Sequence, residues 1–299
     1  VATFGAQAAT IQVTTGGDAG TGATCTLRQA ILALNAASTA GTGCLTSGPG
    51  FGTSDTVDLT LQAGTITLAG AAPLAPTVWM EINGPGASVL TVSGANASRV
   101  FEHPSGPPLD LYLNGLTVAS GRSTGPGGCI FGGNVYLASS VVTGCTALHD
   151  PGNTSYLNGI GGGIAAYSVT MKGSTVSGNT AEIAGGGVFA KYAGLYGSVI
   201  ANNTVSGRAC TVASSSKYCL PLLFGGGGMM AGSAQLVHTT VSGNTVNASS
   251  ITGAGPPGTY NFGVGGGITQ FNKYTPEVAA AAAKSTIVGR GDVASRAAA

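Results

Sequence analysis

Charged side chains are scarce in this chain of 299 residues. Asp, Glu, Lys and Arg together make up 7% of the sequence, and the net charge is +1, whereas an average soluble protein carries roughly 25% charged residues. Phosphate binding needs clustered Lys and Arg. The sequence has no basic stripe, so nucleic acid is not an expected partner. It also lacks a run of about 18 apolar residues, so no membrane span is predicted.

Residues suited to acid–base chemistry are few and scattered. The chain has ten Asp and Glu residues and three His residues. Asp55 and Asp58 form the closest acidic pair, but side chains three residues apart in a strand point to opposite faces. The histidines are far apart, and no G-x-S-x-G motif accompanies them. We therefore predict no catalytic residue, no cofactor and no metal site, and expect that the protein is not an enzyme.

Glycine and apolar residues are abundant and recur in a repeat. The chain has 52 glycines, and 43% of its residues are hydrophobic, which is enough to bury a core, unlike a disordered segment. Four segments starting at Gly127, Gly161, Gly185 and Gly226 align without a gap. They read GGCIFGGNVYLASSVVTGCTA, GGGIAAYSVTMKGSTVSGNTA, GGGVFAKYAGLYGSVIANNTV and GGGMMAGSAQLVHTTVSGNTV.

The columns of this alignment predict the fold. Short runs alternate with a period of two, which indicates strands. One unit cannot bury its own apolar row, but copies stacked about 4.8 Å apart close a continuous core. The sequence therefore predicts an all-β fold, a single right-handed parallel β-helix. The apolar columns are Ile130, Ile164, Val188 and Met229; Leu137, Met171, Leu195 and Leu236; and Val142, Val176, Ile200 and Val241.

A polar column runs through the same repeat. Its members are Cys145, Asn179, Asn203 and Asn244. Stacked side-chain amides can hydrogen-bond along a stack, so we predict an asparagine ladder inside a corner, with Cys145 continuing the row. The glycines before the first apolar column are expected to allow sharp corners.

The beginning of the chain differs from the repeat. Residues Thr26 to Ala37 predict a helix, because Leu27, Ile31 and Leu34 share one face. An open solenoid end exposes core and strand edges, so this helix is expected to be an N-terminal cap. Residues 1–47 are predicted to form this N-terminal segment, and residues 48–299 the β-helix.

Long insertions follow the polar column. Between successive units lie 13, 3 and 20 residues, and 18 more precede Gly265. All of them are predicted to leave the β-helix at one corner. Loops on a rigid scaffold are a common place for binding, and neutral insertion is the equal alternative.

The six cysteines indicate disulfides. An even number with local spacings suits an oxidising compartment, so the protein is expected to be secreted or displayed at the cell surface. Sequential pairing is predicted. The pairs are Cys25 with Cys44, Cys129 with Cys145, and Cys210 with Cys219. The partners of Cys129 and Cys145 stay open at this point, because the corner between them decides whether their Cα atoms come within about 7 Å.

The segment CTLRQAI from Cys25 to Ile31 resembles the N-terminal C-S-L-R-E-A-I motif of a large bacterial group of β-helix surface proteins. Thr replaces Ser and Gln replaces Glu. The GGGI and SGNT repeats are similar to those of chlamydial polymorphic outer-membrane proteins and autotransporter passengers. The resemblance implies a secreted β-helix, with adhesion as the commonest proposed role. It carries over no catalytic residue.

Two functions remain open. The first is an extracellular structural or adhesive surface protein, self-assembling into filaments or a surface layer. It is favoured because a soluble monomer normally keeps roughly 25 to 35% of its surface charged. Its partners would be further copies, a surface polysaccharide or a host surface. The alternative is a polysaccharide-binding or pectate-lyase-like cleaving protein. Six tyrosines are candidates for a sugar-stacking surface, with packing an equal alternative: Tyr156, Tyr192, Tyr196, Tyr218, Tyr260 and Tyr274.

Overall fold

The structure, a computed structural model, consists mostly of parallel strands. It describes residues 8–20, 22–70, 72–103, 109–150, 158–207, 225–247, 266–270, 282–284 and 287–288. The described strands form three sheets of twelve, eight and five strands, here called the large, middle and small sheets. All pairings are parallel except β1 with β2. The predicted all-β architecture of stacked parallel sheets is confirmed.

The large sheet runs in the order β2-β1-β3-β5-β8-β11-β14-β17-β20-β23, with β7 also beside β11 and β24 beside β20. Its strands are β1 (Thr10–Gln12), β2 (Thr46–Ser47), β3 (Asp55–Asp58), β5 (Met80–Asn83), β7 (Phe101–Glu102), β8 (Asp110–Asn114), β11 (Ile130–Ala138), β14 (Ile164–Lys172), β17 (Val188–Tyr196), β20 (Met229–Val237), β23 (Ile268–Gln270) and β24 (Ala282–Lys284).

The other two sheets contain shorter strands. The middle sheet is β4 (Gly64–Thr67), β6 (Leu90–Ser93), β9 (Thr117–Ala119), β12 (Val141–Thr143), β15 (Thr175–Ser177), β18 (Val199–Ala201), β21 (Thr240–Ser242) and β25 (Ile287–Val288). The small sheet is β10 (Arg122–Thr124), β13 (Thr146–Leu148), β16 (Thr180–Ala181), β19 (Thr204–Val205) and β22 (Thr245–Val246).

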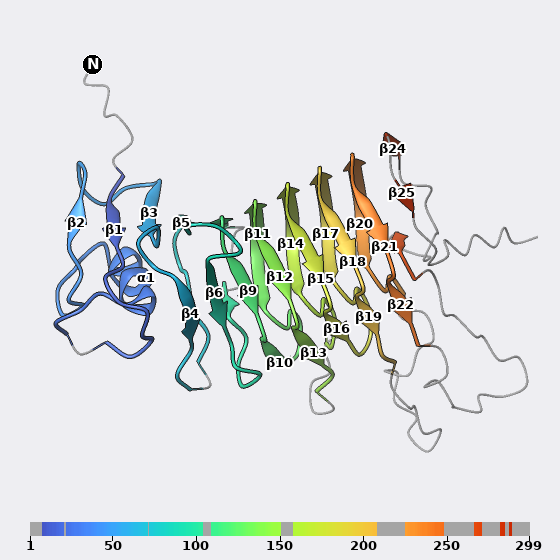
Figure 1. The fold of residues 1–299 in the computed structure, drawn as a ribbon, viewed down its shortest axis with the longest axis horizontal. Helices are drawn as coiled ribbons and strands as arrows, with labels where there is room; N and C mark the ends of the chain where they lie inside the picture. Colours follow the sequence, from blue (N-terminus) through green and yellow to red (C-terminus); the bar gives the residue numbers. More distant parts are fainter. Residues whose placement is uncertain are drawn as a thin grey trace, which may run out of the picture.

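Each repeat unit contributes one strand to each sheet, always in the same order. The chain passes through β11, β12 and β13, then β14, β15 and β16, and the next two units follow the same path. We call each passage a coil; the coils lie side by side along the long axis (Figure 1). Register follows the sequence columns, because Ile130 pairs with Ile164, and Ile164 with Val188.

The core lies between the sheets and is built from the apolar columns. Ile164, Val188 and Met229 are fully buried, which confirms their predicted inward register. The Leu137 and Val142 columns are buried as well. Burial of a Val, Leu or Ile side chain is worth roughly 1.5–3 kcal/mol, so each added coil extends the core by several such contributions.

The predicted helix is present as α1 (Leu27–Ala36). Thr26 caps it, and Gln29 completes a capping box by accepting from the Thr26 backbone N–H. Its apolar face belongs to the same core cluster as Ile11 and Val57. The large sheet, however, already starts before the helix. β1 pairs in parallel with β3, and the antiparallel strand β2 covers the outer edge of β1. The sheet thus continues across residue 47, so helix and first coils share one core.

The asparagine column forms a buried ladder. The Nδ2 of Asn179 donates to the Oδ1 of Asn203, and the Nδ2 of Asn203 donates to the Oδ1 of Asn244, both at 2.9 Å. Each Oδ1 also accepts a backbone N–H from the preceding coil; the one on Asn179 accepts that of Cys145 at 3.0 Å. Every coil boundary in this row is therefore bridged by a side-chain amide.

Two glycines of a unit serve different purposes. Gly161 turns the corner with a φ of +64°, a conformation that favours glycine. A Cβ on Gly163 would lie 3.1 Å from the amide of Asn179, so this glycine makes room for the ladder. The prediction that the glycines form corners is confirmed for the first glycine of the unit. At the third glycine, a side chain would collide with the neighbouring coil and with the asparagine amide.

Both disulfides that fall within the described residues pair as predicted, Cys25 with Cys44 and Cys129 with Cys145. Cys129 occupies the column of Gly163, and Cys145 that of Asn179. The disulfide therefore replaces the glycine–asparagine contact of the later coils with a covalent bond. Cys210 and Cys219 lie outside the described residues, as do most of the long insertions.

A hydroxyl row that the sequence analysis did not identify lies between the large and middle sheets. The backbone N–H of Ser140 donates to the Oγ of Ser174 at 3.2 Å, and that of Ser174 donates to the Oγ of Ser198 at 3.3 Å. Thr239 occupies the same column and donates to the carbonyl oxygen of Leu195. All four side chains are buried. The aligned units show this column as Ser, Ser, Ser and Thr, so the signal was present in the sequence.

Candidate functional site

The outward positions of the three sheets differ in chemistry. The small sheet presents a row of threonines, Thr146, Thr180, Thr204 and Thr245. The middle sheet presents small side chains, Thr91, Ser93, Val141, Thr143, Thr175, Ser177, Val199, Ala201, Thr240 and Ser242. The large sheet instead presents aromatic side chains, Tyr112, Tyr136, Tyr167, Tyr192 and Tyr196, with Trp79 directly before β5. We call this outward surface of β5, β8, β11, β14 and β17 the aromatic face.

Strand alternation places the rings of Tyr112 and Tyr136 outside. Leu111 and Leu113 flank Tyr112 and are buried, as are Val135 and Leu137, which flank Tyr136. Because neighbouring strands are in register, Tyr112 lies directly opposite Tyr136. Their rings stack with centroids 4.2 Å apart and planes 4° from parallel. The ring of Trp79 tilts against Tyr112 at 5.1 Å.

Amide and carboxylate groups join the strands around these rings. The Nδ2 of Asn114 donates to Glu81 at 2.6 Å and to the Oδ1 of Asn83 at 2.8 Å. The Nδ2 of Asn134 donates to Asp110 at 2.7 Å. We call β5, β8 and β11 with these side chains the interlocked half of the aromatic face, because its polar groups are held by one another.

This packing raises the pKa of the Tyr112 phenol. Burial penalises its charged form and, together with the nearby Tyr136 and Asp110, raises the pKa of Tyr112 to about 12. Tyr112 is therefore a neutral hydroxyl near neutral pH, able to donate a hydrogen bond; the Asp110 oxygen lies 3.5 Å away.

The rings on β14 and β17 are arranged more openly. Tyr167 and Tyr192 meet edge to face with centroids 5.5 Å apart, and they are 45% and 44% exposed. The Nζ of Lys191 lies 5.0 Å from the centroid of Tyr167 and 5.2 Å from that of Tyr192. It donates to the Tyr167 hydroxyl at 3.5 Å, and this hydrogen bond is the main cause that raises the pKa of Lys191. We call these strands the open half.

Charge also separates the two halves. The strands of the interlocked half contain Glu81 and Asp110 and no Lys or Arg. Strands β14, β17 and β20 contain Lys172 and Lys191 and no Asp or Glu. In a chain with so few charges, one face thus has an acidic end and a basic end.

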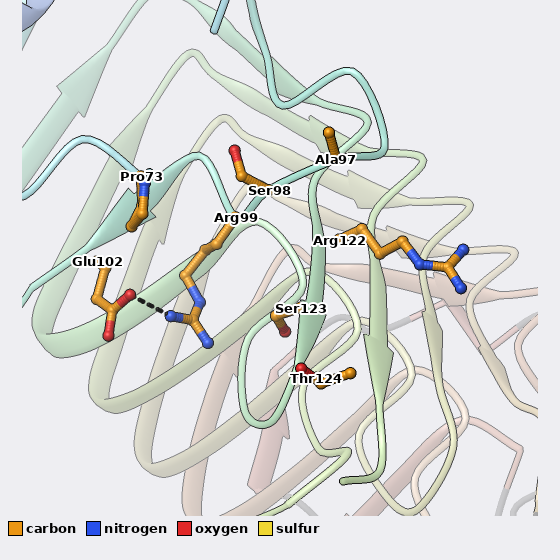
Figure 2. A pocket seen from close by; sticks show the side chains of 8 residues that line it. All are labelled: Pro73, Ala97, Ser98, Arg99, Glu102, Arg122, Ser123 and Thr124. Atoms are coloured by element: carbon orange, nitrogen blue, oxygen red, sulfur yellow. Dashed lines mark hydrogen bonds and ion pairs between the residues drawn. The ribbon is translucent and has the colours of Figure 1, made fainter. Parts of the chain in front are cut away.

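A pocket of about 310 Å³ lies at another place, beside β10 (Figure 2). Arg99 holds its wall together. It pairs with Glu102 at 2.6 Å and donates to the carbonyl oxygens of Gly127 and Pro126. Figure 2 shows Arg122 pointing away from Arg99, so the two cations do not converge on one ligand. The pocket is lined by Pro73, Ala97, Ser98, Arg99, Glu102, Arg122, Ser123 and Thr124.

The closest acidic pair has a structural role. Asp55 is buried and accepts the backbone N–H groups of Ala9 and Gly52, whereas Asp58 faces outward and accepts from Thr60. The predicted opposite orientation is correct. Within the described ranges, no three His, Cys, Asp or Glu side chains gather as metal ligands. In the same part of the chain, no helix is long and apolar enough to cross a membrane.

Sequence reasoning identified only part of the aromatic face. Of the six candidate tyrosines, Tyr192 and Tyr196 belong to it, and Tyr196 donates to Gln235 at 2.9 Å. The others, Tyr156, Tyr218, Tyr260 and Tyr274, lie outside the described residues. The predicted set did not include Trp79, Tyr112, Tyr136 and Tyr167. The segments DLYLN and NVYLA share a tyrosine between two buried apolar residues, and this shared pattern could have revealed Tyr112 and Tyr136 as neighbours.

Comparison with known proteins adds no relative. No family model matches the chain, and no curated protein or solved structure shows significant similarity to it.

Proposed function

We propose that the chain is an extracellular adhesive surface protein, built on a right-handed parallel β-helix, that binds a surface glycan through the aromatic face. Parallel strands joined by crossovers are right-handed in about 98% of cases, which supports the handedness. The two disulfides support an oxidising compartment. They also suit the expected placement outside the cell.

The observation that carries the proposal is the unequal distribution of aromatic side chains. The large sheet presents five tyrosine rings on neighbouring strands and Trp79 directly before β5, whereas the outward positions of the other sheets hold mostly small residues, apart from Arg122 and Leu148. Aromatic side chains offer apolar area with a polar tip, which suits sugar rings, whose C–H faces are apolar and whose edges carry hydroxyls. The Asn and Asp groups beside Tyr112 supply matching donors and acceptors.

Glycan cleavage is the alternative activity on the same face. Most glycosidases use two carboxyl groups, one on each side of the scissile bond. Glu81 and Asp110 each accept a short hydrogen bond from an asparagine on the adjacent strand. This arrangement fixes the two carboxylates as part of a rigid surface, which supports recognition over catalysis.

The test is retention of the full chain on a panel of immobilised neutral and acidic polysaccharides. We expect binding to at least one of them, without new reducing ends in the bound glycan. Trp79→Ala combined with Tyr192→Ala should weaken retention, whereas the control Thr143→Ala with Thr175→Ala on the middle sheet should not. Failure to bind any polysaccharide, or equal effects of both variants, contradicts the proposal. Accumulating reducing ends would favour the cleaving enzyme.

A further inference from the structure

We infer that the open half binds anionic glycans, with a carboxylate or sulfate of the sugar on Lys191 and the sugar ring against Tyr167 and Tyr192. The inference rests on the proposed function, since it concerns the same face. It adds the chemical class of the ligand and the part of the face that selects it.

The first reason is that the tyrosine rings of the open half are accessible to a ligand. Tyr167 and Tyr192 are the most exposed tyrosines among the described residues, and they meet edge to face, so neither ring stacks on the other. The stacked pair Tyr112 and Tyr136 has its facing ring surfaces covered by each other. A sugar that stacks on this face therefore finds more free ring area in the open half.

The second reason is that the Lys191 ammonium group can bind an anion beside these rings. An ammonium group has three N–H donors. Even where both tyrosine hydroxyls accept from Lys191, one donor remains for a ligand. The ammonium is held over two rings, at 5.0 and 5.2 Å from their centroids, so it is positioned before the ligand arrives. Such positioning lowers the ordering cost of binding.

The third step is the surrounding field. No Asp or Glu occurs on β14, β17 or β20, so no acidic side chain of these strands opposes the charge of Lys191. Glu81 and Asp110 lie at the other end of the face and repel anions there. Exposed charges act over about 8–10 Å at moderate salt, so an acidic chain is directed to the basic end.

The experiment compares polysaccharides that differ only in charge. Hyaluronate, polygalacturonate and alginate are each immobilised beside their methyl esters, and the full chain is titrated onto all six. Binding should favour the free acids and weaken with added salt. Lys191→Gln should weaken binding to the free acid roughly three- to fivefold, the size expected for one exposed charge contact, and should leave binding to the ester unchanged.

Two controls sharpen the result. Lys191→Arg keeps the cation over the rings and should bind as the parent does. Lys172→Gln removes the same charge from the same sheet but at the far end of β14, and should have less than about half the effect of Lys191→Gln. Equal losses for both Gln variants would indicate a diffuse field and overturn the inference. Equal binding of acids and esters would overturn it too, while leaving glycan adhesion intact. Binding to a neutral polysaccharide but to none of the free acids would overturn the inference alone, and adhesion itself fails only if no neutral or acidic polysaccharide is bound.

Discussion

The interlocked and open halves of the aromatic face belong to one sheet of parallel strands, yet their side chains behave differently. In the interlocked half, Tyr112 stacks on Tyr136, and Asn114 links Glu81 with Asn83. In the open half, Tyr167 and Tyr192 touch only edge to face below a single lysine. The contrast shows that rings on one β-sheet either stack on one another or stay half-exposed, and we propose that only the exposed rings are free to contact a ligand.

The boundary between the two halves coincides with a change in the contact that closes the corner of each coil. The coil that contains β11 is closed by the Cys129–Cys145 disulfide, and the following coils use the glycine–asparagine contact. Four changes test this contrast, starting with the largest expected effect.

Removal of the disulfide should have the largest effect. Cys129→Ala with Cys145→Ala opens a loop of sequence separation 16, for which the expected loss is about 3 kcal/mol of unfolding free energy. Urea denaturation monitored by circular dichroism measures it. Cys129→Gly with Cys145→Asn recreates the pair of the later coils and should recover about 1 kcal/mol, because the new amide joins the ladder. No recovery would mean that the two closures are not equivalent.

Removal of one asparagine from the ladder should cause the second largest loss of unfolding free energy. Asn203→Ala removes the acceptor of the Asn179 backbone N–H and the donor to Asn244. Because these groups are buried, the expected loss is about 1 to 3 kcal/mol. Thermal and urea unfolding provide the measurement. A loss below a few tenths of a kcal/mol would show that water replaces the amide.

The two halves should respond differently to truncation. Asn114→Ala breaks two hydrogen bonds of the interlocked half and should reduce the unfolding free energy by about 1 kcal/mol. Tyr167→Ala, in the open half, should cost no more than about 0.5 kcal/mol, as is usual for surface substitutions. Parallel urea titrations compare them. Equal losses would remove the distinction between the halves.

The smallest effect concerns pH. The pKa of Tyr112 is raised to about 12 from its ordinary value of 10.0, mainly by burial. A raised pKa means that its contribution to stability is complete below pH 10 and is lost as the pH rises toward 12. Phenolate absorbance should show a late phase near pH 12 whose amplitude Tyr112→Phe lowers by one tyrosine. If the substitution leaves the late phase in place, the assignment is wrong.

Much of the fold was predictable because successive coils place the same type of side chain at the same position of the core. Every aligned coil has an apolar residue at the position of Ile164, and three of the four have an amide at that of Asn179, so the aligned copies reveal both columns. β1 could not be predicted in this way. Thr10–Gln12 is a short strand without an aligned copy, and it joins the sheet only by pairing with β3. The antiparallel β2, which covers that edge, has no repeat signal either.

The sequence by itself predicted the parallel strand architecture, the inward columns, the asparagine row and a helix from Thr26 to Ala37, because each follows from a local pattern or a repeated one. The Cys129–Cys145 pairing was decided by the corner that brings the two residues together. Only the tertiary structure decided how the outward residues combine. Trp79 and Tyr112 come from different coils, as do Tyr167 and Tyr192, and no local pattern records that these rings meet. The pairing of strands from different coils determines which rings meet. It therefore decides that Tyr112 and Tyr136 stack on each other, whereas Tyr167 and Tyr192 meet edge to face and stay exposed.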